Sequence, residues 1–192
     1  MTALAALALV GCTPAEPAPV PETSATAVAE VEPSPTSVPA PATKVFEPAS
    51  TCTEMLGSVL EDEILAGGYT LFSSTSAGGS HYPIASTQSG DPYSCWYGVD
   101  GVDLSTFEIA AQRLGATERD GVAALLSSKG FTNTGEGDVA TWVMEGDQGQ
   151  KPAIVHVLRA DSWLTAFSAY GGAKQVETLS RYLTTVADQL YR

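Results

Sequence analysis

The chain has 192 residues, with 22 acidic side chains against nine Lys and Arg, and a formal net charge of −13. Binding to a polyphosphate backbone requires clustered basic side chains, and those in this chain are scattered singly, which argues against nucleic acid as a partner. The same negative field repels anionic lipid headgroups and wall polymers.

The N-terminal segment has the pattern of a bacterial lipobox. An uncharged apolar run starts at Ala3 and ends in Leu-Val-Gly-Cys at residues 9–12. Because the run is too short to span a bilayer and presents small residues for cleavage, we expect residues 1–11 to be removed as a lipoprotein signal peptide. Cys12 is then the mature N-terminus and the site of lipid attachment, which places the protein on the extracytoplasmic face of the cell membrane. The alternative is an ordinary secretory signal.

The first basic residue of the chain is Lys44, whereas a signal peptide opens with positive charge, so we expect the true translation start to differ from the first Met. The next segment, residues 12–50, holds nine of the chain's 12 prolines and no aromatic residue before Phe46. Such a composition cannot bury enough apolar surface to offset the entropy of folding. We therefore expect a disordered tether with polyproline II bias.

Residues 51–192 hold all three Trp and all seven Tyr residues and have the length of a single globular domain. With Cys12 assigned to lipid, Cys52 and Cys95 remain as a pair in an oxidising compartment, and we expect them to form a disulfide. Their spacing lacks the Cys-x-x-Cys form of redox-active pairs, so the disulfide is expected to be structural.

The first half of the domain predicts two helices and two strands. Residues 51–54 have the form of a capping box, and the helix after them ends at Gly67 and Gly68. One face of this helix is expected to be buried, with residues Leu56, Val59, Leu60 and Ile64. A long loop at 67–92 follows, then strands at 93–99 and 104–114 separated by the turn Asp100-Gly101. A second helix, capped by residues 117–120 and ending at Gly130, buries Val122, Leu125 and Leu126.

The second half predicts an antiparallel meander and a final helix. The expected strands cover residues 139–145, 153–159 and 163–170. In the final helix, apolar residues recur at steps of three and four, at Val176, Leu179, Leu183, Val186 and Leu190. Because the last two strands are apolar on both faces, layers are needed on both sides of the sheet. The expected class is α+β, an antiparallel sheet of about five strands with helices packed on it.

This layout resembles small actinobacterial envelope lipoproteins of unknown function. In that family a lipobox and a Pro/Thr-rich tether precede a domain with one cysteine at its first helix and a second in a Cys-x-aromatic strand. Here these are Cys12, Cys52 and Cys95, and Tyr97 stands where the family usually has Trp, with Trp96 before it on the opposite face of the strand. The resemblance implies a PsbP-like sandwich, and binding, sensing or scaffolding in the envelope.

No reaction signature accompanies this layout, so we expect neither an enzyme nor a cofactor or metal site. The two histidines, His81 and His156, lack metal-ligand spacing, and no Gly-x-Ser-x-Gly motif occurs. His156 is expected to be a core histidine with a local partner, and His81 lies in a Gly/Ser-rich stretch. The acidic residues 61–63 and the pair Asp100 and Asp103 lack the calcium-loop pattern.

Two functional hypotheses remain. In the first, Trp96, Trp142, Met144 and Trp163 cluster on one sheet face, and with His81 they face an apolar or glycan ligand. The alternative is that the same tryptophans are core residues, since aromatic side chains dominate burial. In the second, the domain is a scaffold for envelope proteins, and the tether raises its effective concentration near membrane partners.

Overall fold

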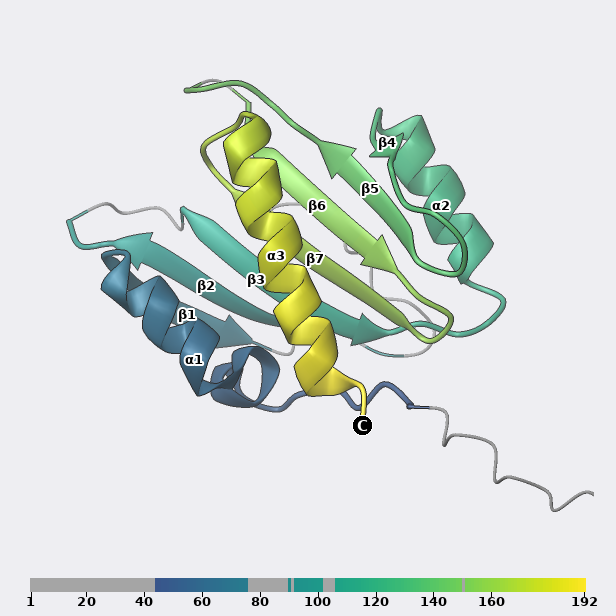
Figure 1. Cartoon of the computed structure of the whole chain (residues 1–192), viewed down its shortest axis with the longest axis horizontal. Coiled ribbons are helices and arrows are strands. Elements are labelled where there is room, and N and C mark those ends of the chain that lie inside the picture. The colour runs from purple at the N-terminus through teal and green to yellow at the C-terminus, as the bar shows by residue number, and fades with distance from the viewer. Residues whose placement is uncertain (1–43, 76–89, 91, 102–105, 150) are drawn as a thin grey trace, which may run out of the picture. The chain divides into compact units, whose positions relative to one another are not determined.

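The computed structural model describes residues 44–75, 90, 92–101, 106–149 and 151–192 (Figure 1). It confirms the α+β class. The elements follow one another in the order α1 (Cys52–Ala66), β1 (Tyr69–Thr75), β2 (Tyr93–Val99), β3 (Phe107–Arg113), α2 (Arg119–Ser128), β4 (Thr132–Asn133), β5 (Ala140–Met144), β6 (Ala153–Leu158), β7 (Ser162–Ser168) and α3 (Ala173–Leu190). In the described part of the chain, no helix combines the length and apolar character needed to cross a bilayer.

The strands form one antiparallel sheet of seven, in the order β1-β2-β3-β7-β6-β5-β4. The expected meander is present as β5, β6 and β7. The expectation of about five strands was wrong, because β1 and β4 add one strand to each edge. β1 lies inside the segment 67–92 that was expected to be a loop. Its register shifts between Leu71 and Ser73, and this bulge removes the alternation by which a strand is recognised in sequence.

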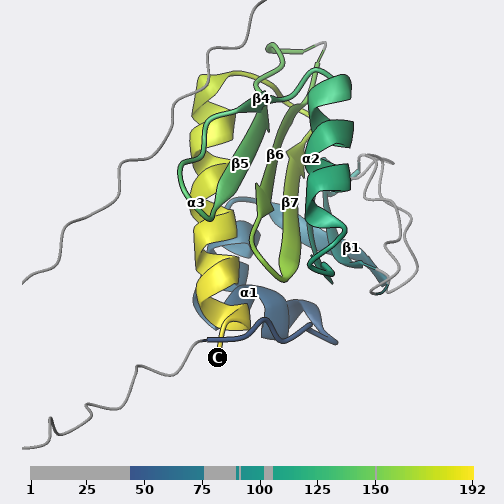
Figure 2. The same cartoon turned by 90° about the vertical axis from the view of Figure 1, so that its right-hand side faces the viewer.

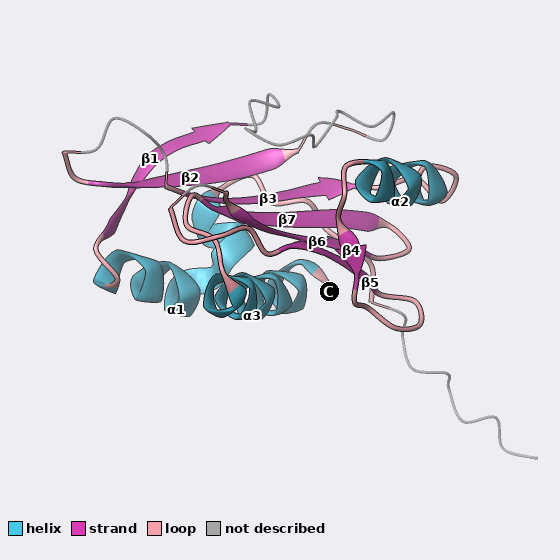
Figure 3. Cartoon of the chain, turned by 90° about the horizontal axis from the view of Figure 1, so that it is seen from above, coloured by secondary structure: helices cyan, strands magenta, loops and turns pink. Residues whose placement is uncertain are grey.

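Helices cover both faces of the sheet, as Figures 2 and 3 show from two sides. α1 and α3 lie together on one face, and α2 lies on the other. The α1/α3 side holds the larger apolar core, in which the final helix buries Leu179, Leu183, Val186 and Leu190 as expected. Under α2, the residues Val122 and Leu126 pack against Ile154, Leu158 and Trp163. The two buried faces of β6 and β7 therefore have separate cores, as their sequences predicted.

Helix α1 begins as expected and then changes direction. Thr51 caps it by accepting a hydrogen bond from the Glu54 amide at 3.1 Å. Gly57 has φ 69° and ψ 155°, which breaks the helical path after its first turn. The second half is therefore rotated relative to the register read from the sequence. Val59, expected on the buried face, is 81% exposed.

A disulfide links the first turn of α1 to strand β2. The sulfurs of Cys52 and Cys95 are bonded, the Cα atoms are 5.8 Å apart, and 43 residues separate the pair in sequence. Both cysteines are buried in the core on the α1/α3 side. The pairing expected from the cysteine count is thus present in the structure.

The packed region includes residues before 51. Phe46 is fully buried and forms an isolated bridge with Tyr191. Val45 and Arg192 exchange two backbone hydrogen bonds, and the Phe46 carbonyl accepts one from Arg113. The segment expected to be tether therefore ends against the C-terminal residues of the domain.

Gly171 marks a tight junction between β7 and α3. A Cβ at this position would lie 2.3 Å from both the Asp147 amide nitrogen and the Lys151 carbonyl oxygen. Both neighbours are backbone atoms, which cannot move aside as a side chain does. We therefore expect Gly171→Ala to lower the free energy of unfolding by roughly 2 to 3 kcal/mol in urea titrations. Gly121→Ala in α2 is the control: it meets open space and should stabilise by up to about 1 kcal/mol. Equal stability of Gly171→Ala and the wild type would show that the backbone is not tightly packed around position 171.

Candidate functional site

A groove runs between α3 and strands β5 and β6 on the α1/α3 face. α3 packs on β7 and β6, and β5 lies on the far side of α3 from α1 (Figure 1). A hollow of about 120 Å³ occupies this space. A larger one of about 430 Å³ lies beside it, lined by residues 44–45, the turn between β6 and β7, and the C-terminal end of α3. Val139 and Arg159 line both hollows, so the two are neighbours, and together they are called the groove below.

The end of the groove between α3 and β5 combines an aliphatic floor with hydroxyl side chains. Val157 of β6, Val139 before β5 and Leu183 of α3 form the floor. Small hydroxyl residues stand where the helix would otherwise meet the sheet, namely Ser180 and Thr184. These short side chains leave space between α3 and β5 that larger residues at the same helical positions would fill.

The outer end of the groove is charged and lies where residues 44–45 join the domain. Lys44, Arg159, Asp161, Asp188 and Tyr191 line the larger hollow there. The guanidinium carbon of Arg159 lies 4.7 Å from the centre of the Tyr191 ring, a cation–π stack. This end of the groove thus holds a fixed cation beside carboxylates of the opposite sign.

Tyr191 contacts three of the residues at the charged end of the groove: Arg159, Asp161 and Ser162. Its hydroxyl donates to Asp161 Oδ1 at 2.5 Å, and the hydroxyl of Ser162 lies 2.7 Å from the Tyr191 hydroxyl oxygen. The Phe46 amide donates to the other Asp161 oxygen at 3.0 Å. Burial, together with the hydrogen bond to Asp161, raises the pKa of Tyr191 to about 12. Tyr191 is therefore a neutral donor at physiological pH, and both oxygens of Asp161 have donors.

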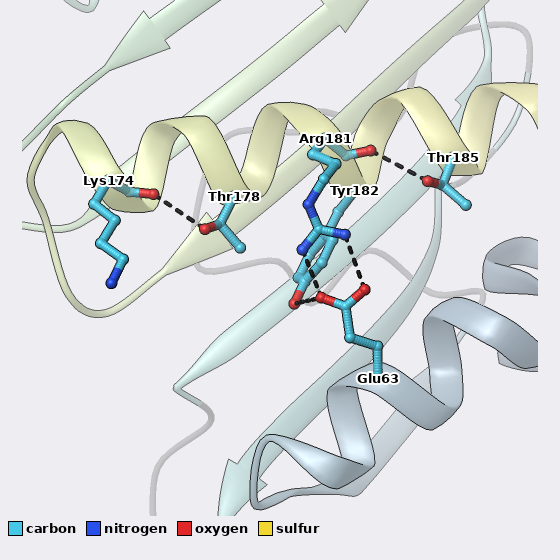
Figure 4. A network of polar contacts seen from close by, with 6 residues as sticks. All are labelled: Glu63, Lys174, Thr178, Arg181, Tyr182 and Thr185. Atoms are coloured by element: carbon cyan, nitrogen blue, oxygen red, sulfur yellow. Dashed lines mark hydrogen bonds and ion pairs between the residues drawn. The ribbon is translucent and has the colours of Figure 1, made fainter.

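A separate hollow of about 170 Å³, the aromatic hollow, lies on the other side of α3 and includes three aromatic residues in its lining. Phe107 meets Tyr182 edge-on at 5.5 Å and Tyr69 at 6.0 Å. Figure 4 shows the polar contacts beside it, where both guanidinium nitrogens of Arg181 donate to Glu63 at 2.8 and 2.5 Å. These hydrogen bonds lower the pKa of Glu63. Both side chains are about half exposed, so the pair contributes little to stability.

The three tryptophans expected to face a ligand lie on the opposite sheet face, the α2 side. Trp163 is fully buried and packs in the core under α2, which leaves no surface of this residue for a ligand. Trp142 and Met144 pack against the edge of the same core. Trp96 on β2 is half-buried and pairs in register with Glu108. Three strands separate β2 from β5, so Trp96 and Trp142 do not share one concavity.

His156 is confirmed as a core histidine. It is fully buried, and its Nδ1 lies 2.7 Å from the Thr165 hydroxyl and 3.1 Å from the indole nitrogen of Trp163. Because an indole N–H only donates, Nδ1 accepts and the ring proton is assigned to Nε2. The ring meets Phe131 edge-on at 4.7 Å. Burial lowers the pKa of His156 to about 3, so the ring is neutral.

The remaining expected residues give no site. His81 and Asp103 lie outside the described residues. Within the described ranges, no three His, Cys, Asp or Glu side chains are arranged to hold a metal ion. Glu63 of the acidic run is committed to Arg181, and Asp100 accepts a hydrogen bond from Thr70 at 3.2 Å.

The residues of the groove were not identified from the sequence. Arg159 follows an apolar strand, Lys44 stands in the expected tether, and Tyr191 lies just beyond the last helix, so no spacing connects them. One signal was present: Arg159 is a cation at the end of a strand that is otherwise apolar on both faces. No protein-family profile, curated protein or solved structure matches this chain.

Proposed function

We propose that this protein is a membrane-anchored extracytoplasmic lipoprotein whose domain binds a small ligand in the groove between α3 and β5. The observation that carries the proposal is the groove itself. Its larger hollow, of about 430 Å³, has the size of small-molecule sites, and it combines an apolar floor with a few polar groups at one end.

The anchoring part of the proposal rests on the sequence. Leu9 to Cys12 form the lipobox, and the Pro-rich segment after them supplies a tether. The Cys52–Cys95 disulfide suits an oxidising compartment. Lys44, at the end of the tether, lines the mouth of the groove, so the lipid anchor and the binding site lie at opposite ends of one segment.

We infer binding rather than catalysis from the chemistry of the groove. The Ser162 hydroxyl contacts Tyr191, but Ser162 is fully buried and the raised pKa of Tyr191 makes it a donor instead of a base. A nucleophile requires an adjacent general base within hydrogen-bond reach. The contacts around Tyr191 supply a fixed network of donors and acceptors, which suits recognition.

Native mass spectrometry of the full lipidated chain, extracted from its own membranes, tests this proposal. We expect a reproducible non-covalent adduct. Thr184→Phe places a ring into the groove from an exposed position on α3 and should abolish the adduct. Thr178→Phe, on the same helix but lining the aromatic hollow, should retain it. A clean apo mass for the wild type would contradict the proposal, and loss of the adduct only in Thr178→Phe would move the site to the aromatic hollow.

The alternative is a protein-binding scaffold, and strand β1 favours it. β1 forms one edge of the sheet and carries no charged residue, and edge strands without such protection pair readily with other chains. Leu71 is 46% and Phe72 61% exposed. A photo-crosslinking amino acid at position 72 in whole cells should then capture a specific neighbour, and capture no greater than at exposed Val59 would count against a scaffold.

A further inference from the structure

Arg159 lines the groove without a carboxylate partner. Within the described residues its guanidinium forms no ion pair, and its Nε is buried without a hydrogen-bond partner. A buried donor without an acceptor costs free energy, and the stack on Tyr191 supplies no acceptor. Because Arg159 lines both hollows of the groove, a bound ligand can supply an acceptor to its guanidinium.

The nearby carboxylates do not fill this role. Asp161 has both oxygens engaged, with the Tyr191 hydroxyl and the Phe46 amide. Asp138 and Asp188 also line the larger hollow, but both are exposed at its rim, where water solvates their charge. Lys44 at the same mouth is exposed as well, so water solvates its charge as it does those of the two carboxylates. The desolvated group at this end of the groove is therefore a donor.

The other end of the groove has the opposite character. From Arg159 the floor continues over Val157, Val139 and Leu183, and no charged side chain other than Arg159 lines this smaller hollow. A ligand that fills both hollows contacts the Arg159 guanidinium at one end and, at the other, an uncharged hollow with an aliphatic floor. A planar guanidinium suits a carboxylate or phosphate, because two N–H groups can donate to two oxygens in parallel.

We propose that the groove binds a ligand with an acidic head on an apolar body. Arg159 receives the head, with Lys44 beside it, and Val139, Val157 and Leu183 hold the first part of the apolar chain. This inference rests on the proposed ligand-binding function and specifies its chemical class. A carboxylate and a phosphate head share the same recognition, and the experiment separates them.

Isothermal titration calorimetry of the full chain carrying Cys12→Ser tests the inference, because this variant lacks acyl chains that compete for the groove. The probes are decanoate, decyl phosphate, decanol and inorganic phosphate, the amphiphiles below their micellar concentrations. We expect at least one acidic amphiphile to bind tenfold or more tightly than decanol, and inorganic phosphate alone to give no measurable heat. The tighter of the two acidic probes identifies the head.

Arg159→Gln should reduce the preference for the acidic probe over decanol to about one, and an unfolding midpoint close to that of the wild type shows that the variant is folded. Arg181→Gln is the matched control. It also removes one positive charge, but from α3 where that helix faces Glu63, and it should keep the preference for the acidic probe over decanol. Arg159→Lys, which keeps the charge without the fork, should be intermediate.

Three results would overturn the inference. If wild-type protein binds decanol and the acidic probes equally, ligand binding stands and the acidic class is wrong. If Arg159→Gln and Arg181→Gln lose the preference alike, the effect is net charge and not this site. If no amphiphile binds the wild type, the proposed function and this inference fail together.

Discussion

Removing the Cys52–Cys95 disulfide is expected to lower the free energy of unfolding by about 3 to 4 kcal/mol. The bond closes 43 residues of chain, and on the chain-entropy model a loop of this length stabilises by that amount through the unfolded state. The whole effect should appear on double replacement, Cys52→Ala with Cys95→Ala. Guanidinium unfolding of the Cys12→Ser chain with and without these replacements measures it.

Reduction of the Cys12→Ser chain with dithiothreitol serves as the matched control, because it opens the same loop without changing core volume. The double variant and the reduced protein should lose similar stability. Unfolding midpoints that are unaffected by both treatments would contradict a disulfide that links α1 to β2.

Acidification is expected to destabilise the fold through His156. The pKa of this buried ring is lowered from 6.5 to about 3, so between these values the unfolded chain binds a proton that the folded chain does not. Stability is therefore complete above pH 6.5 and falls as the pH decreases, by about 1.4 kcal/mol per unit once the unfolded ring is protonated. We expect a loss of roughly 2 kcal/mol between pH 7 and pH 5 in urea titrations.

His156→Gln should flatten this pH dependence, because the amide does not titrate and its oxygen can still accept from Trp163. His81→Gln, at the other histidine, provides the control and should retain the slope. The window from pH 7 to pH 5 lies above the range of ordinary carboxyl groups. Equal slopes for the wild type and His156→Gln would show that the buried ring is not the titrating group.

The elements that the sequence predicted well are those whose patterns are strong and local. α3 has apolar residues at steps of three and four over 18 residues, and its buried face is as expected. The strands β5 to β7 are separated by short turns, which fixes their antiparallel order. In α1 the cap was predicted, but not the rotation at Gly57, because a glycine inside a helical pattern does not reveal its φ angle.

The groove depends on non-local packing, which a single sequence does not encode in any spacing. Its mouth is built from Lys44, Arg159 and Tyr191, which come from opposite ends of the chain and from its last hairpin. The sequence singled out tryptophans instead, because aromatic residues mark both cores and sites. Trp163 proved to be core, and the aromatic residue of the groove is Tyr191, just beyond the last helix, where no periodic pattern singles it out.

Methyl NMR shows directly whether a ligand occupies the groove beside α3. In a titration of the Cys12→Ser chain with decanoate, the methyl resonances of Val139, Val157 and Leu183 should shift in a saturable manner. Those of Val122 and Leu126, under α2 on the opposite face, should not move. Shifts confined to methyl groups outside the groove, or no saturable shift at all, would contradict ligand binding in the groove.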